Sequence, residues 1–203
     1  MSKGNLIVFS GPSGSGKGTI LANYFNTEAG KKAALSVSAT TRLPRPGEID
    51  GINYYFMSKE QFEERIKNNG FLEYAEFCGN YYGTPKAEVM QKLDEGTDVI
   101  LEIEVQGAMK IKQQVPDAVM IFVTPPSLKE LHSRRVSRGT ESVDVIDKRI
   151  NQAMSEVKCV DEYTYVIVND RLDTAVEEFT AILKAEHLKV NKNTDTIKEV
   201  CKL

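Results

Sequence analysis

The sequence has few cysteines and no long apolar segment. Its three cysteines, Cys78, Cys159 and Cys201, are too far apart to form a metal-spaced pair or a disulfide framework. The apolar stretch near the N-terminus is too short for a signal peptide, and no stretch approaches the roughly 18 apolar residues that a membrane span needs. We therefore expect a cytoplasmic protein of a reducing compartment, with no membrane partner.

The sequence also lacks an excess of positive charge. Its 26 lysines and arginines are outnumbered by 29 aspartates and glutamates, which gives a net charge of −3. Proteins that bind nucleic acids or membrane surfaces usually show a basic excess, so neither partner is expected. Any anionic ligand must then be held by cations that cluster locally. The length of 203 residues fits one core that carries two small inserted lobes.

Four short apolar runs predict buried strands. Each is rich in β-branched residues, as in a parallel sheet that is covered on both faces. Helix signals fall between the runs, and this alternation predicts an α/β fold with right-handed crossovers. The runs are Leu6–Phe9, Val99–Ile103, Val119–Val123 and Tyr165–Val168, with Leu35–Ser38 as a weaker fifth strand.

Capping residues predict where several helices begin. One helix is expected from Lys17 to Phe25, and the last long helix is expected to begin at Asp173. Ser58 with Gln61 and Ser127 with Glu130 form capping boxes at the start of two others. Thr84 is the expected N-cap of a further helix, which has Pro85 at its first position and stops at Gly96.

Two segments interrupt the alternation of strands and helices. Residues 36–85 are rich in Tyr, Arg, Gly and Pro, whereas residues 127–158 are helical and rich in Arg. We expect both to be lobes placed over the edge of a core formed by residues 1–35, 86–126 and 159–187. Residues 188–203 are polar and are expected to fray or to form a marginal last helix.

The strongest motif lies between the first strand and the first helix. Its glycines permit unusual backbone angles and close approach to a ligand, and successive N–H groups can form an anion nest at the helix N-terminus. Its lysine can reach a transferring phosphate. The sequence therefore predicts a phosphate-binding loop. Its residues are Gly11, Pro12, Ser13, Gly14, Ser15, Gly16, Lys17, Gly18 and Thr19.

One position in this loop departs from the strict pattern. Gly18 stands directly after the lysine, where a Ser or Thr hydroxyl would bind magnesium, and Thr19 follows it. This order is frequent in nucleoside monophosphate kinases. Thr19 is the candidate metal ligand, directly or through water.

A second anion site is suggested by two arginines in the first inserted segment. Arg42 and Arg45 lie among small hydroxyl residues, prolines and a glycine. The planar guanidinium fork suits a phosphate monoester. Two arginines in a loop are, however, more often a solvated surface, so this pair alone leaves both interpretations open.

Together with the phosphate loop, this segment resembles the GMP-binding lobe of guanylate kinases. The matching pattern is Ser-x-Thr-Thr-Arg-x-Pro-Arg-x-Gly-Glu, and further matches follow at residues 71–73, 79–84, 101–107, 138–140 and 168–170. The resemblance covers about residues 4–187. It implies a three-layer P-loop kinase core with a central parallel sheet, a GMP-binding lobe at 36–85 and a helical lid at 127–158.

The resemblance also implies a reaction. The γ-phosphoryl group of ATP would pass to GMP, or to dGMP, with Mg²⁺, giving ADP and GDP in purine nucleotide metabolism and GMP recycling. The protein would act as a monomer or weak homo-oligomer, and its lobes would close over both nucleotides.

Carried over residue by residue, the family pattern assigns these roles. The residues for ATP are the phosphate loop, Arg134, Arg138 and Asn169. Those for the GMP phosphate are Arg42, Arg45, Tyr54 and Tyr82, and those for guanine are Ser38, Glu73 and Thr84, with Glu102 near the base and the magnesium region. The catalytic residues are Lys17, Arg42, Arg138 and Arg149.

Several members of this set have simpler interpretations. Asn169 is also a typical turn residue after a strand, and Thr84 is also a helix cap. Tyr54 and Tyr55 alternate, so one of them should be in the core. The lid arginines also fit a solvated basic face. Glu104 and Arg135 depart from the residue types usual in the family.

The chemistry of Glu73 can be argued without the resemblance. Guanine presents N1–H and an exocyclic amine side by side, and one carboxylate can accept from both. Adenine presents an unprotonated N1 there, so a buried carboxylate would lose its partner. Sites of this kind reject analogues by up to roughly 10⁴–10⁵-fold.

Two other functions stay open at this point. One is a nucleoside monophosphate kinase with a different base preference, and equal reaction of GMP and AMP would refute the guanine assignment. A non-catalytic scaffold that binds phosphopeptides in the GMP lobe would form no ADP or GDP, although such domains typically lack the intact loop that Lys17 belongs to.

Overall fold

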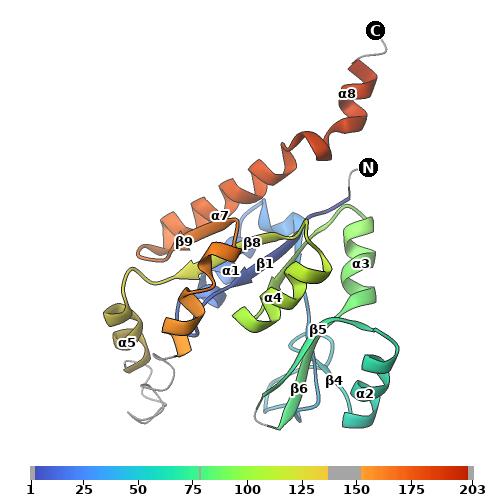
Figure 1. Cartoon of the computed structure of the whole chain (residues 1–203), viewed down its shortest axis with the longest axis vertical. Coiled ribbons are helices and arrows are strands. Elements are labelled where there is room, and N and C mark those ends of the chain that lie inside the picture. Colours follow the sequence, from blue (N-terminus) through green and yellow to red (C-terminus); the bar gives the residue numbers. More distant parts are fainter. Residues whose placement is uncertain (1–2, 78, 137–151, 201–203) are drawn as a thin grey trace.

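The computed structural model describes residues 3–77, 79–136 and 152–200, and two β-sheets run through them. In the larger sheet, five parallel strands follow the order β2–β7–β1–β8–β9 (Figure 1). All four apolar runs belong to this sheet, which confirms the α/β class. Its strands are β1 (Leu6–Ser10), β2 (Ala33–Leu35), β7 (Asp98–Glu102), β8 (Val119–Thr124) and β9 (Tyr165–Val168).

The weaker fifth strand is not where the sequence places it. Strand β2 ends at Leu35, and Ser36–Ser38 lead away toward the second sheet. Strand β2 is an edge strand of only three residues, Ala-Ala-Leu, without the β-branched residues that mark the other strands, so its composition does not fix its ends.

Helices cover both faces of the parallel sheet. Side chains alternate along a strand, so Ile7 and Phe9 point to one face of β1 and Leu6 and Val8 to the other. The first face packs against α1 and α7, and the second against α3 and α4, which gives three layers. These helices are α1 (Lys17–Phe25), α3 (Lys86–Asp94), α4 (Val105–Gln114) and α7 (Leu172–His187).

A second sheet forms most of the first inserted segment. Its order is β4–β3–β6–β5, and helix α2 covers one of its faces, where Phe62 stacks on Phe71 and Tyr81. Tyr55 packs against this cluster, so it is the tyrosine of the pair that joins the core. The elements are β3 (Ala39–Thr40), β4 (Tyr55–Phe56), α2 (Lys59–Lys67), β5 (Phe71–Phe77) and β6 (Asn80–Pro85).

The predicted cap of α2 is confirmed. Ser58 Oγ accepts from the N–H of Gln61 at 3.2 Å, and the Gln61 side chain accepts from the N–H of Ser58 at 2.8 Å. Both orphan donors of the first turn therefore have partners.

The predicted start of α3 is wrong by one residue. Thr84 and Pro85 are the last residues of β6, and the helix begins at Lys86 with Pro85 as its N-cap. Thr84 pairs with Glu73 across the sheet, and its hydroxyl donates to the Glu73 carboxylate, so it does not cap the helix.

The second capping box is only half formed. Ser127 Oγ accepts from the N–H of Glu130 at 3.0 Å at the start of α5 (Leu128–Val136). The Glu130 carboxylate instead binds Arg134 Nε at 2.8 Å. Residues 152–157 are also helical. Helix α5 and the second sheet lie at the same end of the core and on different sides of it (Figure 1).

The C-terminal segment extends beyond the core. Helix α7 begins one residue before the predicted Asp173, and α8 (Thr194–Val200) follows it after a short 3₁₀ turn and projects away from the sheet (Figure 1). A marginal last helix was expected here. Among the described residues, no helix has the length and apolarity required to cross a bilayer.

Candidate functional site

The predicted phosphate loop follows the C-terminal end of β1, and α1 begins at its lysine. In open α/β sheets this edge is where ligands bind. Three loop glycines, Gly11, Gly14 and Gly16, have positive φ angles, and at Gly11 and Gly16 a Cβ would also clash. Gly11 has φ 144°, and a Cβ there would lie 2.1 Å from the Val123 carbonyl oxygen. Gly16 has φ 92°, and a Cβ there would lie 2.2 Å from Nδ2 of Asn169.

The loop presents donors and positive charge. Ser15 Oγ is buried and has no hydrogen-bond partner among the described residues, although buried hydroxyls are normally paired. Lys17 is only 9% exposed, and its Nζ donates to the carbonyl oxygens of Gly11 at 2.6 Å and Pro12 at 3.2 Å. The N-terminus of α1 adds a partial positive charge at the same place. This arrangement suits a polyphosphate.

Asn169 connects the end of β9 to the loop. Its side-chain Nδ2 donates to the carbonyl oxygen of Ser15 at 2.8 Å, and the residue is 6% exposed. In a trans peptide the N–H points away from the C=O. The bond to the Ser15 carbonyl therefore turns the N–H of Gly16, in the same peptide, to the other side of the loop backbone. From the sequence, Asn169 was interpreted as a turn residue or as a residue beside the adenine of ATP. Neither interpretation includes its contact with Ser15.

Arg134 extends the same network. Its Nη2 donates to the carbonyl oxygen of Asn169 at 3.0 Å, so one predicted lid arginine lies beside the residue that supports the loop. The other two, Arg138 and Arg149, lie outside the described residues, as does part of the predicted lid.

The predicted phosphate ligands of the first lobe form a cluster around Arg42. Its guanidinium carbon lies 5.4 Å from the ring centroid of Tyr54 and 5.8 Å from that of Phe56. The rings of Tyr54 and Tyr82 are 6.1 Å apart. Arg42 also forms paired hydrogen bonds to Glu48, at 3.0 and 2.9 Å. The fold thus brings together three of the four predicted ligands.

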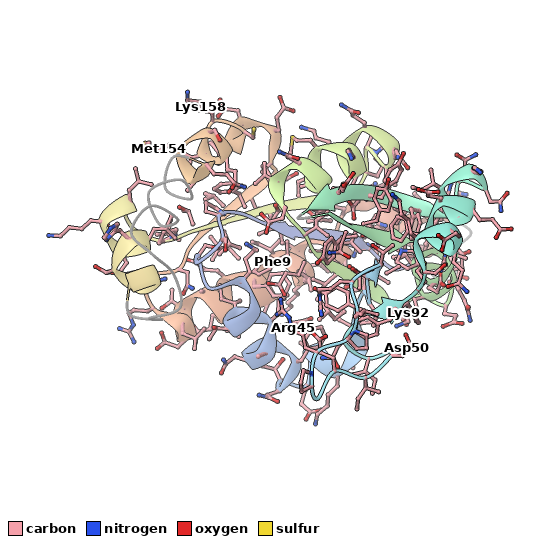
Figure 2. All side chains as sticks on the ribbon, turned by 90° about the horizontal axis from the view of Figure 1, so that it is seen from below. Phe9, Arg45, Asp50, Lys92, Met154 and Lys158 are labelled. Carbon is pink, nitrogen blue, oxygen red and sulfur yellow. The ribbon has the colours of Figure 1, made fainter. Side chains whose placement is uncertain are left out.

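Arg45 is the fourth, and its side chain is exposed. Viewed from below, Arg45 and Asp50 lie on one side of the molecule and Met154 and Lys158 on the other, with Phe9 of β1 between them (Figure 2). The first lobe and the helical segment before Cys159 therefore flank the strand that leads into the phosphate loop.

The guanine-facing residues lie on one face of the second sheet. Glu73 on β5 stands opposite Thr84 on β6, and the Thr84 hydroxyl donates to Glu73 Oε1 at 2.7 Å. Both residues are buried, at 8% and 1% exposure. Burial raises the pKa of the Glu73 carboxyl, and the hydrogen bond from Thr84 and the charge of Lys110 oppose this effect. The strand register continues to Ser38, directly before β3, which falls next to Thr84.

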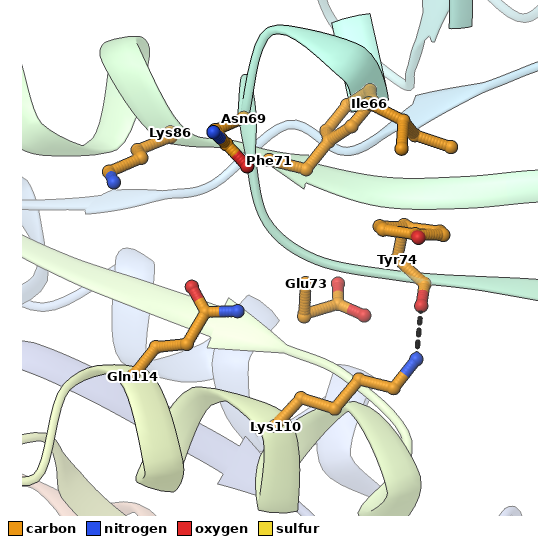
Figure 3. Close-up of a pocket in the computed structure, with 8 residues that line it drawn as sticks. All are labelled: Ile66, Asn69, Phe71, Glu73, Tyr74, Lys86, Lys110 and Gln114. Carbon is orange, nitrogen blue, oxygen red and sulfur yellow. Dashed lines mark hydrogen bonds between the residues drawn. The ribbon is translucent and has the colours of Figure 1, made fainter. Parts of the chain in front are cut away.

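A cavity of about 510 Å³ borders Glu73 on the side of α4. In Figure 3 the Glu73 carboxylate lies between Tyr74 and the side chains of Lys110 and Gln114, and Lys110 donates to the carbonyl oxygen of Tyr74. The lining residues are Ile66, Asn69, Phe71, Glu73, Tyr74, Lys86, Lys110 and Gln114. The cavity is lined by residues of α2, β5, α3 and α4 rather than by the phosphate loop.

Glu102 places a carboxylate next to the phosphate loop. It ends β7, and a Cβ on Gly18 would lie 3.6 Å from its Oε1. Although the side chain is exposed on one side, the surrounding protein raises the pKa of its carboxyl; Lys17 lowers this pKa, and Glu104 raises it further.

The side-chain oxygens near the phosphate loop can be compared with the ligands that Mg²⁺ prefers. Glu102 and Thr19 are hard oxygen ligands, as this ion requires. Among residues 3–77, 79–136 and 152–200, no group of three or more His, Cys, Asp or Glu side chains could hold a metal ion. The residues present fit Mg²⁺ that takes most of its ligands from nucleotide phosphates and water.

Two contacts of the site were missed by sequence reasoning. The bond from Asn169 to Ser15 joins residues 154 positions apart, and no local pattern marks it. The pairing of Arg42 with Glu48 had a signal, because Glu48 is an acidic residue in a loop that otherwise collects cations.

Known proteins resemble this chain over nearly its whole length. The family model described as guanylate kinase matches residues 3–186. A guanylate kinase of Lactococcus lactis is 53% identical over 94% of this chain and 92% of its own length. One from Streptococcus thermophilus is 54% identical over 94% and 90%. The crystal structure of guanylate kinase from Anaplasma phagocytophilum superposes with a TM-score of 0.73, at 33% identity, over 94% of this chain and 90% of that one.

Proposed function

This chain belongs to the guanylate kinase family and is an ATP:GMP phosphotransferase, and we propose that the residues described above carry out its reaction. The phosphate loop holds ATP, and the Arg42 cluster and the Glu73–Thr84 pair hold GMP. The γ-phosphoryl group passes from ATP to the GMP phosphate, and ADP and GDP leave.

On the ATP side, backbone N–H groups of the loop and Ser15 Oγ donate to phosphate oxygens. Lys17 moves from its carbonyl partners to the transferring phosphate, where its charge offsets the charge that develops there. Asn169 keeps the Ser15–Gly16 peptide oriented. Arg134 and Arg138 approach the phosphates from the lid.

On the GMP side, one face of the second sheet binds both the phosphate and the base of the nucleotide. Tyr82 and Thr84 alternate to the same face of β6, roughly 7 Å apart along the strand. Tyr82 belongs to the arginine cluster that binds the phosphate with Arg45 and Tyr54, and Thr84 pairs with the base-binding Glu73. Ser38 and Glu102 complete the base site.

The chemistry needs positioning and charge more than proton transfer. The GMP phosphate is already an oxyanion, so it attacks without a strong general base. Lys17, Arg42, Arg138 and Arg149 hold the two phosphates in line and offset the charge of the transition state. Bound Mg²⁺ would supply positive charge that offsets the charge of the phosphates, and Thr19 and Glu102 would hold it, directly or through water. Because both substrates are metabolites of the cytoplasm, we place the enzyme there, in GMP recycling and purine nucleotide metabolism.

The observation that carries the residue assignment is the shared face of Tyr82, Thr84 and Glu73, which combines a phosphate cluster with a buried carboxylate. A coupled assay with ATP and each of GMP, dGMP, AMP and UMP, with and without chelator, tests it. We expect turnover of GMP and dGMP only, and loss of turnover without Mg²⁺. Equal turnover of AMP would refute the assignment of Glu73.

A further inference from the structure

Glu48 is an acidic residue at a site for a phosphate, and the roles assigned so far do not use it. It lies on the loop between β3 and β4, six residues after Arg42, with an exposed side-chain fraction of 20%. A carboxylate near a phosphate dianion repels it. Its presence in the cluster therefore needs a separate reason.

The hydrogen bonds of Arg42 give that reason. Nη1 donates to the Leu43 carbonyl oxygen at 2.7 Å and to Glu48 Oε2 at 3.0 Å, and Nη2 donates to Glu48 Oε1 at 2.9 Å. A guanidinium has five N–H donors. These bonds use both hydrogens of Nη1 and one of Nη2, so Glu48 occupies only the Nη1/Nη2 edge.

The second edge of the guanidinium consists of the Nε–H and the remaining Nη2–H. These two parallel donors form another fork with the spacing that a phosphate or carboxylate accepts. The hydroxyl of Tyr82 is a hydrogen-bond partner of the guanidinium, and the rings of Tyr54 and Phe56 pack against it. Arg42 can therefore keep Glu48 while its second edge, together with the Tyr82 hydroxyl, meets a ligand phosphate.

Glu48 is itself fixed in place. Its Oε2 also accepts from the backbone N–H of Arg45 at 2.7 Å, so one carboxylate links the two arginines among the predicted phosphate ligands. The hydrogen bond from Arg42 lowers the pKa of Glu48, which keeps the carboxyl ionised at neutral pH. With 17% exposure, the Arg42 side chain is shielded enough for the pair to be geometrically defined.

We propose that Glu48 is a positioning residue for GMP, which grips the Nη1/Nη2 edge of Arg42 so that the Nε/Nη2 edge meets the GMP phosphate. The inference rests on the proposed role of Arg42. The competing interpretation is that Glu48 stands in for the phosphate and must leave when GMP binds. The two make opposite predictions, because removing a positioning residue weakens GMP binding and removing a competitor strengthens it.

Steady-state kinetics of Glu48→Gln separates them. Glutamine keeps the shape but offers one acceptor oxygen and one NH₂ group, which faces a guanidinium N–H. We expect the KM for GMP to rise about 10-fold, with kcat and the KM for ATP within about 2-fold. Glu48→Asp, which keeps the charge, should fall between the wild type and the glutamine variant. An unchanged or lower KM for GMP in Glu48→Gln would overturn the proposal.

The chain offers a matched control. Glu88 forms a paired bond with Arg65 at 2.5 and 2.7 Å, with side-chain exposures of 27% for Arg65 and 38% for Glu88. This pair joins α2 to α3 and has no contact with Arg42. Glu88→Gln removes the same charge from the same kind of pair, and it should leave the KM for GMP unchanged. A similar rise in this control would mean that any loosening of the lobe has the effect, which also overturns the proposal.

A double-variant cycle shows whether Glu48 acts through Arg42. Lysine has no fork, so in an Arg42→Lys background the further change Glu48→Gln should add less than about 2-fold to the KM for GMP. A full additive effect would contradict the inference. If Arg42→Lys alone leaves the KM unchanged, the proposed role of Arg42 fails. If Arg42→Lys raises it and Glu48→Gln does not, only the inference about Glu48 fails.

Discussion

At the scale of single residues, Glu73 combines burial with a titratable group. It is 8% exposed, and one of its oxygens already accepts from Thr84. We expect Glu73→Gln to raise the KM for GMP by at least about 100-fold, because the amide presents a donor toward a guanine donor and cannot accept both N–H groups. The KM for ATP should change by less than about 3-fold.

Glu76 provides the control for this change. It lies on the same strand β5, opposite Tyr81, and points to the other face with an exposed side chain. Glu76→Gln should leave both KM values as in the wild type. Equal losses for GMP and ATP in Glu73→Gln would indicate a folding defect and contradict a role in base recognition.

The raised pKa of Glu73 predicts a pH dependence. Guanine binding requires the ionised carboxylate, and the ionised fraction falls as the pH approaches the pKa from above. Since burial raises this pKa above 4.5, GMP affinity should begin to fall at a higher pH than for an ordinary glutamate. The GMP phosphate also titrates, near about pH 6. The profile of Glu73→Gln contains only that second effect, so parallel profiles of the two enzymes would contradict this prediction.

Some residue contacts could be predicted from the sequence and others could not. The resemblance assigned Glu73 and Thr84 to the base and Arg42, Tyr54 and Tyr82 to the phosphate, and the fold brings the members of each group together. The bond from Asn169 to the loop could not be predicted, because it depends on how β9 packs beside β8 and on a rotamer that only the folded chain fixes.

At the scale of elements, helix α4 packs against the base site. A Cβ on Gly107 would lie 3.0 Å from Glu73 Oε2 and 3.3 Å from its Cδ. Alanine is a better helix former than glycine by roughly 1 kcal/mol, so Gly107→Ala should not lower the thermal midpoint. It should nevertheless raise the KM for GMP by about 5-fold or more, because the carboxylate must shift by a few tenths of an ångström.

Thermal unfolding and kinetics on the same sample check this prediction. A variant that keeps the wild-type KM for GMP would show that the Glu73 carboxylate can move freely. A variant that is both less stable and weaker toward GMP would show that the added methyl group disturbs the helix and not only the site.

The ends of helices and strands were predicted less reliably from the sequence than their presence. Strands β1, β7 and β8 lie within one residue of their predicted ends, because burial on both faces gives a continuous apolar run. The edge strand β9 has its predicted bounds because it is rich in β-branched residues, although Val166 and Val168 are exposed. The other edge strand, β2, is a short Ala-Ala-Leu segment without β-branched residues, and it was misplaced. Thr84 and Pro85 have the composition of a helix start, but the pairing of β6 with β5 overrides that local preference.

At the scale of the whole molecule, the first lobe and α5 stand on different sides of the same end of the core (Figure 1). We predict that binding of both nucleotides brings the lobes together and excludes water from the phosphates. Small-angle scattering should show a smaller radius of gyration with GMP plus a non-hydrolysable ATP analogue than with either alone. An unchanged radius would contradict closure.

The central claim is that the phosphate loop and the Arg42 cluster hold two nucleotides with their phosphates facing each other. Calorimetric titration with a bisubstrate ligand, in which adenosine and guanosine are joined through a chain of phosphates, tests it most directly. We predict a Kd at least about 100-fold below that of ATP, and loss of this gain in both Lys17→Ala and Arg42→Ala. A ligand that binds no more tightly than ATP, or that is insensitive to Arg42→Ala, would contradict it.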